Sequence, residues 1–158
     1  MLRIFHKLQD LRFSVLADVY YDCRLEKEDL LAAEQDFYFY LKNSFFKDEK
    51  GFYAVWEDQG RYVAALRMEP YKNGLLLAGL QTLYGEERKG FATTLVQQTL
   101  SYLADSDINV VYSHVEKTNT ASIRVHEKCG FSILCDSATF IDGSFSVNAR
   151  TYLYNIKP

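Results

Sequence analysis

Proline, cysteine and long apolar runs are all scarce in this chain. The two prolines, Pro70 and Pro158, leave no proline-rich linker, and we find no repeat or low-complexity segment. The three cysteines lack metal-type spacing, which favours reduced thiols in a cytoplasmic protein. No run of about 18 apolar residues occurs, and the charges within residues 1–13 argue against a signal peptide. These absences predict one cytoplasmic domain over residues 1–158, with no metal and no membrane partner. The cysteines are Cys23, Cys129 and Cys135.

A surplus of basic residues is also absent. The chain has 18 Lys and Arg residues against 21 Asp and Glu residues, which gives a net charge of −3. A broad nucleic-acid interface normally shows a basic surplus, so we expect no nucleic-acid partner. What the chain does have is 48% hydrophobic residues and 12 tyrosines. That supply suits a self-sufficient core and leaves tyrosines for a ligand site.

The hydrophobic pattern predicts the element order β-α-α-β-β-β-α-β-α-β-β. After a short strand at residues 2–6, apolar residues recur at helical spacing from Leu8 and again from Leu30. The period then shortens to that of strands. We therefore expect an α/β (α+β) fold with helices flanking a mixed, mostly antiparallel sheet of six to seven strands. The later elements are expected as strands at 52–56, 61–68 and 75–83, a helix at 90–104, a strand at 108–115, a helix at 118–130, a strand at 131–135 and a long hairpin turning at Asp142 and Gly143.

Residues 85–95, GEERKGFATTL, lead from a predicted strand into a predicted helix. Such a junction directs free backbone N–H groups and the positive end of a helix dipole at one point. Gly90 lets a ligand approach the backbone, and Ala92 keeps the first turn thin. Arg88 and Lys89 add donors for phosphate. The segment suits a pyrophosphate, although these residues alone fit a solvated loop at least as well. The chain lacks the Gly-Lys-Ser/Thr of a P-loop and the G-x-G-x-x-G of a dinucleotide-binding fold.

A second motif, NTASIRVHEKCGF at residues 119–131, changes this interpretation. Together with GEERKGFATTLV, it resembles the paired motifs of the GNAT acyltransferase family, R/Q-x-x-G-x-G/A and N-x-x-A/S-I-x-x-Y-E-K-x-G-F. The expected element order fits that family over nearly the whole chain. Two positions depart from the pattern: Glu87 replaces the leading Arg or Gln, and His126 replaces the Tyr. The matching residues are Gly90, Phe91, Ala92, Asn119, Ser122, Ile123, Glu127, Lys128, Gly130 and Phe131.

The resemblance implies an N-acetyltransferase that moves an acetyl group from acetyl-CoA, its co-substrate, to a primary amine of a small molecule or peptide. In the family, the loop that opens the helix holds the pyrophosphate, and the end of the preceding strand binds the pantetheine arm as an added strand would. Nothing in the sequence names the amine, and dimerisation through the final hairpin stays open. The residues implied for the cofactor are Gln81, Thr82, Leu83, Arg88, Lys89, Gly90, Phe91, Ala92, Thr93 and Asn119.

The resemblance also implies catalytic positions for two histidines. His126 stands at the family's tyrosine acid, which protonates the departing thiolate; the alternative is a core hydrogen bond. His114 stands where N-terminal acetyltransferases of ribosomal-protein type carry a glutamate base; the alternative is that it fills space between strand and helix. Glu116 is a weaker candidate base. Because Glu87 and His126 depart from the family pattern, the alternative function is a CoA-binding module with weak or no catalysis.

Overall fold

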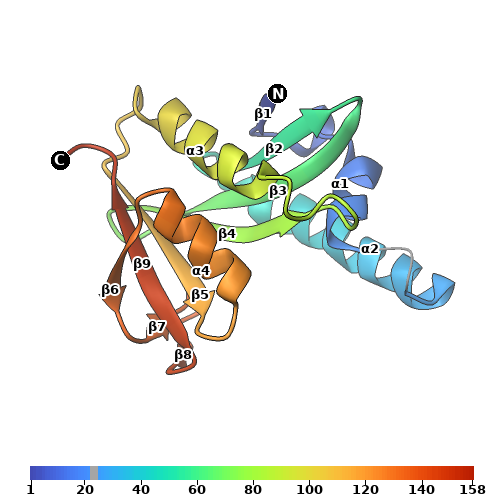
Figure 1. Ribbon diagram of the computed structural model, residues 1–158. Coiled ribbons are helices and arrows are strands. Elements are labelled where there is room, and N and C mark those ends of the chain that lie inside the picture. Colours follow the sequence, from blue (N-terminus) through green and yellow to red (C-terminus); the bar gives the residue numbers. More distant parts are fainter. Residues whose placement is uncertain (22–24) are drawn as a thin grey trace.

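A seven-stranded sheet forms the centre of the computed structural model, which describes residues 1–21 and 25–158 (Figure 1). Its strand order is β1-β2-β3-β4-β5-β9-β6, and every neighbouring pair is antiparallel except β4 and β5. This confirms the expected mixed sheet. Cys23 lies outside the described residues. The strands are β1 Leu2–Phe5, β2 Phe52–Asp58, β3 Arg61–Tyr71, β4 Gly74–Thr82, β5 Val110–Glu116, β6 Ser132–Cys135 and β9 Ala149–Asn155.

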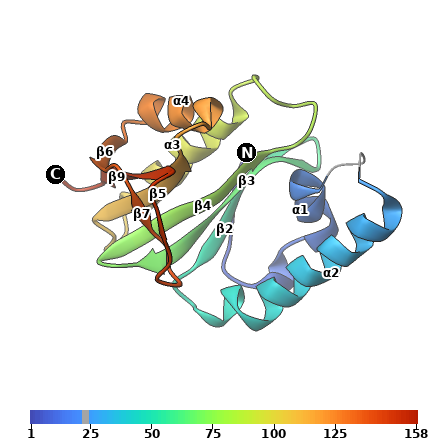
Figure 2. The ribbon, with the colours of Figure 1, turned by 90° about the horizontal axis from the view of Figure 1, so that it is seen from below.

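Helices cover both faces of the sheet. Figure 2 shows α3 and α4 on one side of the strands, with α1 and α2 on the opposite side. The alternation of side chains along β2 and β3 explains this, because it gives each face its own apolar row. Ala54 and Leu66 belong to the core under α3, whereas Tyr53 and Val55 belong to the core under α1 and α2. The helices are α1 Phe13–Tyr20, α2 Lys27–Asn43, α3 Phe91–Leu103 and α4 Thr120–Lys128.

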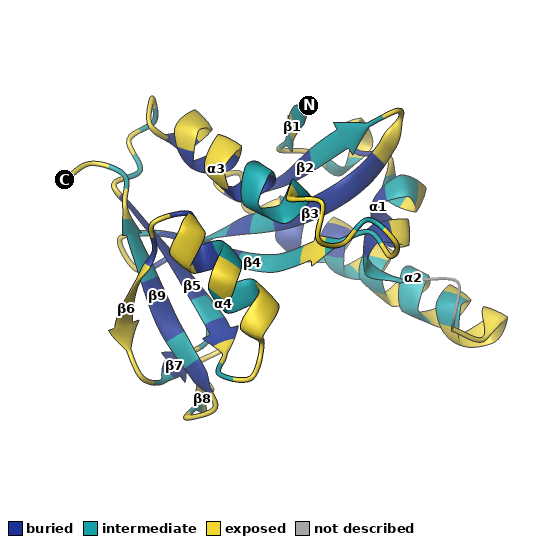
Figure 3. Cartoon of the chain, viewed as in Figure 1, coloured by how far each residue is buried: buried dark blue, intermediate teal, exposed yellow. Residues whose placement is uncertain are grey.

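Burial is uneven between the two helical layers (Figure 3). Helix α3 buries five residues, Leu95, Val96, Thr99, Leu100 and Leu103. Along the longer α2, Leu41 is the one residue classed as buried among those the structure describes there. Helix α2 is therefore less deeply buried than α3, and a cavity opens beside it on this face of the sheet.

The beginning of the chain differs from the prediction of a helix from Leu8. Leu8–Asp10 forms a single 3-10 turn, and α1 begins only at Phe13. Arg12 interrupts the helix because its backbone N–H donates to the Tyr62 hydroxyl and its guanidinium donates to the Gly60 carbonyl oxygen.

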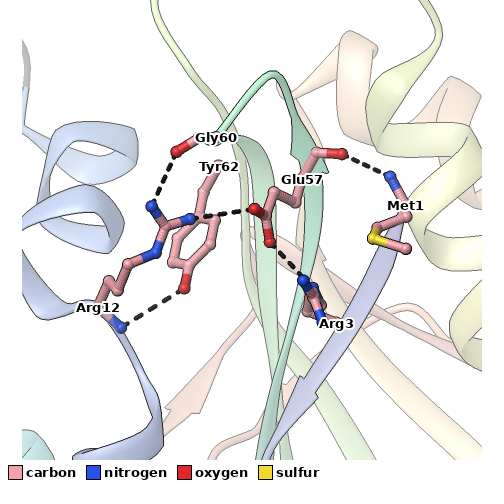
Figure 4. A network of polar contacts seen from close by, with 6 residues as sticks. All are labelled: Met1, Arg3, Arg12, Glu57, Gly60 and Tyr62. Carbon is pink, nitrogen blue, oxygen red and sulfur yellow. Dashed lines mark hydrogen bonds and ion pairs between the residues drawn. The ribbon is translucent and has the colours of Figure 1, made fainter.

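The same guanidinium pairs with Glu57, which also pairs with Arg3 (Figure 4). Met1 completes this network, because its amino group donates to the Glu57 carbonyl oxygen. The network ties β1 and the start of α1 to the β2–β3 turn. Each exposed pair contributes at most about 1 kcal/mol, so its main effect is to set where α1 starts.

The end of the chain also differs from the long hairpin that the sequence predicts. The strands flanking the Asp142–Gly143 turn are short: β7 Ala138–Thr139 pairs only with β8 Phe145–Ser146, in a separate sheet. The chain then continues into β9, which pairs with β5 and β6 rather than with β7. Burial accounts for this choice, because Tyr152 of β9 packs in the core against His126 of α4, and Thr151 is buried on the opposite face, where it donates to the Ser137 carbonyl oxygen.

Candidate functional site

Strands β4 and β5 are paired only near their beginnings. Their parallel register joins residues 75–77 to residues 111–113, and no further pairing of these strands is found within the described chain. Strand β4 also carries a bulge: Ala65 pairs with Gln81 and Arg67 with Ala78, which leaves one extra residue on β4. Gly79 lies in this bulge with φ +59. Beyond it the two strands run apart (Figure 1).

The end of β4 keeps a free backbone edge towards β5. Leu83 donates its N–H to the Val63 carbonyl oxygen on the β3 side. Because backbone groups alternate along a strand, those of Thr82 face the opposite, unpaired edge. The Gln81 side chain donates to the Thr82 carbonyl oxygen across 3.3 Å. An extended ligand with amide groups could therefore add to this edge as a further strand.

The loop after β4 has an unusual backbone. Gly85, Arg88 and Gly90 all have positive φ, of 86°, 62° and 83°. Gly90 is the N-cap of α3, and no side chain of the described residues caps it. The first amides of a helix have no partner within the helix, so those of Phe91, Ala92 and Thr93 are available to an anion. A Cβ added to Gly90 would have no neighbour within 4 Å, so the approach to the backbone is open.

The positive and negative charges on the side chains of this loop nearly balance. Glu86 accepts from Lys89 at 2.8 Å and from Arg61 at 3.1 Å, and the Lys89 hydrogen bond in particular lowers its pKa. Glu87 turns back and accepts the Gly85 N–H at 2.8 Å. Among the described residues, Arg88 has no ion-pair partner. The loop therefore offers an anion its backbone amides and the Arg88 cation.

Asn119 lies at the start of α4, where it acts as the helix cap. Its Oδ1 accepts the Ser122 N–H at 3.1 Å. Gly130 follows the helix with φ +89, the conformation that commonly stops a helix. The second motif therefore defines both ends of α4, and this accounts for much of its residue pattern.

His126 is buried, with 1% of its surface exposed. Its Nδ1 lies 2.7 Å from the Ser122 carbonyl oxygen, and its Nε2 lies 2.8 Å from Ser113 Oγ. A carbonyl oxygen only accepts, so Nδ1 carries a proton. Ser113 Oγ also lies 3.2 Å from the Leu77 carbonyl oxygen, and its single proton can serve only one acceptor. In the neutral ring this acceptor is the nearer His126 Nε2. Burial lowers the pKa of His126, which keeps the ring neutral. Both nitrogens are thus engaged inside the protein.

His114 lies on β5 with a different environment. Its Nδ1 is 3.1 Å from Thr151 Oγ1, and Thr151 donates its hydroxyl proton to the Ser137 carbonyl oxygen at 2.8 Å. Because a hydroxyl has a single proton, Thr151 must accept from His114 Nδ1–H. This tautomer leaves a lone pair on Nε2, a buried atom for which no well-aligned hydrogen-bond partner is found among the described residues. Burial is the largest effect on the pKa of His114 and lowers it, against a smaller rise from the Thr139 backbone close to the ring, so the ring is neutral at pH 7.

A cavity of about 660 Å³ opens beside His114 on the α2 face of the sheet. Phe140 and Tyr71 contact the imidazole edge-on and hold it against this cavity. The cavity reaches Gly79 in the bulge of β4, so it lies next to the point where β4 and β5 separate. Glu116, the weaker candidate base, is exposed and does not line it.

Two charged residues of this cavity, Arg67 and Glu69, were not anticipated from the sequence, and Tyr40, one of the tyrosines available for a ligand site, lies beside them. Arg67 Nε donates to Glu69 Oε1 at 2.9 Å, and the Tyr40 hydroxyl donates to the same oxygen at 2.9 Å. One signal was present, because Arg67 and Glu69 are charged residues within a strand that is otherwise largely buried. A charge in such a strand usually has a partner or a function.

Comparison with known proteins agrees with this architecture. The acetyltransferase (GNAT) family matches residues 16–131, and the chain therefore belongs to that family. No curated protein matches it significantly. Among the described residues, no helix has both the length and the apolar character needed to cross a membrane.

Several solved acetyltransferases share the fold at low sequence identity. Aminoglycoside 6'-acetyltransferase type Ii has a TM-score of 0.71 and 16% identity, with 100% of this chain and 98% of that chain covered. Ribosomal-protein-alanine N-acetyltransferase from Brucella melitensis gives 0.66 and 17%, with coverage of 97% and 99%. A spermidine N-acetyltransferase SpeG chimera from Vibrio cholerae and hSSAT gives 0.66 and 15%, with coverage of 99% and 95%.

Proposed function

We propose that this protein is an acetyl-CoA-dependent N-acetyltransferase acting on a primary amine of a small molecule or peptide. The observation that carries the proposal is the position of His114. Its unprotonated Nε2 has no well-aligned partner among the described residues, and the ring lines a cavity that reaches the bulge of β4. The named activities of the structural neighbours, on aminoglycosides, spermidine and ribosomal protein, support an amine acceptor without selecting one.

The cofactor side of the proposal uses the backbone. The amides at the start of α3 and the Arg88 side chain fit a pyrophosphate, because both are donors left without an acceptor within the described chain. The free edge at Thr82 fits the pantetheine arm. Gln81, Leu83 and Lys89 are proposed as its neighbours, and Asn119 contributes by fixing α4. Acetyl-CoA supplies the activated acetyl thioester.

The acceptor side supplies the base. An alkyl amine has a pKa of about 10, so it is protonated at pH 7 and cannot attack. His114 Nε2 takes one amine proton, directly or through water, and Thr151 holds the ring in the tautomer that allows this. The amine nitrogen then bonds to the acetyl carbon and the carbon–sulfur bond breaks. The nitrogen loses its second proton, which the departing thiolate takes up, and His114 returns its proton to water. The products are the N-acetyl amine and the free thiol.

The acid role predicted for His126 stays a prediction, and its environment favours the alternative of a core hydrogen bond. Its Nδ1–H is committed to Ser122, and Nε2 accepts from Ser113. A thiol has a pKa of about 8.5, so its thiolate is a tolerable leaving group without an acid. We propose that His126 mainly holds α4 against β5 at Ser113, the last residue of β5 that pairs with β4.

The test is release of free thiol from acetyl-CoA with a panel of amines. His114→Ala should lower kcat/KM by about 10²–10⁴, the usual contribution of a general base, and leave acetyl-CoA binding intact. His6→Ala is the matched control, because His6 is exposed and does not line the cavity. Equal activity of the wild type and His114→Ala would exclude this base.

A CoA-binding module without efficient catalysis is the second candidate, and the folding of Glu87 onto Gly85 within the loop favours it. Thiol release distinguishes the two functions. A module is stabilised by acetyl-CoA, by about 2.7 kcal/mol at 100 times its Kd, yet releases no thiol with any amine. Thiol release that depends on His114 would exclude it.

A further inference from the structure

Arg67 and Glu69 form an ion pair that the proposed chemistry does not use. Both side chains project from β3 into the cavity that contains His114. Arg67 lies opposite Ala78 in the β3–β4 register, and Ala78 directly follows the last residue of β4 that pairs with β5. Likewise, His114 directly follows Ser113, the last residue of β5 that pairs with β4. The small Ala78 side chain thus leaves room between the cation and the candidate base.

The guanidinium of Arg67 is held in place but incompletely used. Nε donates to Glu69, the Tyr53 hydroxyl lies close to the guanidinium, and no second carboxylate pairs with Arg67 in the part of the chain that the structure describes. The Tyr40 ring lies 5.9 Å from the guanidinium carbon, and the Tyr40 hydroxyl holds Glu69 from the other side. Two fixed donors at one end of a planar cation form the fork that binds a carboxylate.

The Tyr53 hydroxyl lies near the same guanidinium. Burial raises the pKa of this phenol, and the positive charge of Arg67 opposes the rise, so Tyr53 stays neutral and cannot neutralise the cation. Its hydroxyl lies close to both the Arg67 guanidinium and the Tyr20 hydroxyl. Because Tyr53 is completely buried and does not line the cavity, it supports Arg67 from within the protein and leaves a ligand in the cavity to meet the guanidinium alone.

The absence of a side chain at Gly79 leaves the space that the Arg67 guanidinium occupies. A Cβ at this position would lie 2.5 Å from Arg67 Nη1 and 3.3 Å from the Tyr20 hydroxyl, which donates to the Gly79 carbonyl oxygen. Gly79 is also the bulged residue at which β4 turns away from β5. The free end of Arg67 therefore lies beside the opening where the proposed thioester and amine meet.

We propose that the acceptor is an amine that carries a carboxylate close to its amino group, as a free amino acid does, and that Arg67 binds this carboxylate. The inference rests on the proposed N-acetyltransferase function. The carboxylate would accept from Nη1 and Nη2 of Arg67 while the amino group faces His114. Glu69 and Tyr40 position the guanidinium. Asp48, Glu69 and Asp142 also line the cavity, so the preference for a carboxylate depends on its position within reach of the Arg67 fork rather than on the total charge of the cavity.

The experiment compares each amino acid with the amine that lacks only its carboxylate. The pairs are glycine and methylamine, leucine and isoamylamine, and lysine and cadaverine, each assayed by thiol release from acetyl-CoA. We expect kcat/KM to be higher for the amino acid of at least one pair. In Arg67→Gln, the ratio within that pair should fall by roughly tenfold to a hundredfold, the value of a hydrogen-bonded charge. Because the ratio compares the same two amines in two enzymes, their intrinsic reactivities cancel.

Two further variants keep the result interpretable. Arg67→Lys keeps the charge without the fork, so the ratio should fall several-fold if Arg67→Gln does not fold. Arg12→Gln removes an arginine that also pairs with a glutamate but lies outside the cavity, and it should leave the ratio unchanged.

The outcomes distinguish the two proposals. Thiol release that is equal or faster for the decarboxylated amines in every pair overturns the carboxylate inference and leaves the N-acetyltransferase function standing. A ratio that survives in both Arg67 variants also overturns it. No thiol release with any amine, despite stabilisation by acetyl-CoA, overturns the proposed function itself.

Discussion

The two halves of the proposed site lie on opposite faces of the sheet and differ in composition, because one consists mostly of backbone groups and the other of side chains. On the α3 face, the proposed cofactor site consists mostly of backbone: the loop with three positive φ angles and the first amides of α3. On the α2 face, the proposed acceptor site consists of side chains: His114, Arg67, Glu69 and Tyr40 around a cavity. A backbone site needs glycine and a helix start at fixed spacing, whereas a side-chain site depends on which strands lie next to one another.

The two histidines show the same contrast. His126 and His114 are both largely withdrawn from water, and burial lowers the pKa of both. His126 has a protein partner for each nitrogen, whereas His114 has a well-aligned partner only for Nδ1 among the described residues. This difference is the basis for proposing a structural role for His126 and a catalytic role for His114, and variants of each residue test that proposal.

The largest expected effect is on stability, from His126→Ala. Removing a buried ring with two hydrogen bonds should cost about 3–5 kcal/mol of unfolding free energy, because it leaves a cavity and removes the partner of the Ser113 hydroxyl. We expect kcat/KM to fall less than tenfold in the protein that remains folded. Urea unfolding and thiol release measure the two quantities. A hundredfold loss of kcat/KM with unchanged stability would instead support the acid role.

The pH dependence of stability tests independently whether His126 is buried and neutral in the folded protein. Burial lowers its folded-state pKa below the unfolded value of about 6.5. The unfolded state then binds the extra proton first as pH falls, so this contribution is present above about pH 6.5 and is lost below it. His126→Asn should show a shallower loss of stability over that interval. Identical pH slopes for the two proteins would contradict the assigned burial.

Much of the fold, and the cofactor half of the site, could be predicted from the sequence because both depend on local patterns. Gly90 and Ala92 mark the loop, and Asn119 and Gly130 mark the ends of α4. Position 126 was predicted, but whether its ring faces ligand or core depends on Ser113, which lies 13 residues away in the chain. The sequence could not settle that question.

The acceptor half shows the limit more clearly. The position of the Arg67 guanidinium depends on Gly79 of the next strand, because the bulge in β4 places the guanidinium beside the glycine. Tyr40 reaches Glu69 from a helix on another layer of the fold. The hydrophobic periodicity of a single segment cannot predict such contacts, because they depend on strand register and on helix packing.

The second expected effect tests His114 through the pH profile of kcat/KM. A base acts only when unprotonated, and burial lowers its pKa below about 6.5. Once the substrate amine's own ionisation is accounted for, activity should stay level from neutral pH down past 6.5. It should then fall about tenfold per pH unit below the pKa of His114. An inflection above 6.5 that is assigned to the enzyme would contradict the neutral ring described for this site.

The third variant, Gly90→Ala, probes the backbone half of the site. Gly90 has φ +83 and open space where a Cβ would lie, and the same holds for Gly60 at φ +77 in the β2–β3 turn. Both substitutions should therefore cost about 1 kcal/mol of stability. Only Gly90→Ala should also weaken acetyl-CoA binding, by about tenfold, the value of one charge-assisted hydrogen bond. Calorimetric titration of both variants makes the comparison, and equal Kd values would remove the loop from the proposed site.

The smallest expected effect concerns Glu87, the position at which this chain departs from its family. Its carboxylate accepts the Gly85 N–H at 2.8 Å and places a negative charge in a loop proposed to hold a pyrophosphate. Glu87→Gln keeps a hydrogen-bond acceptor and removes the charge, so acetyl-CoA should bind about two- to fivefold more tightly at low salt, with the gain shrinking as salt is added. Glu49→Gln, an exposed acid far along the chain from this loop, is the matched control. Unchanged or weaker binding in Glu87→Gln would mean that the carboxylate shapes the loop rather than opposing its ligand. Glu87 would then act by holding the backbone of the loop in the conformation that this half of the site requires.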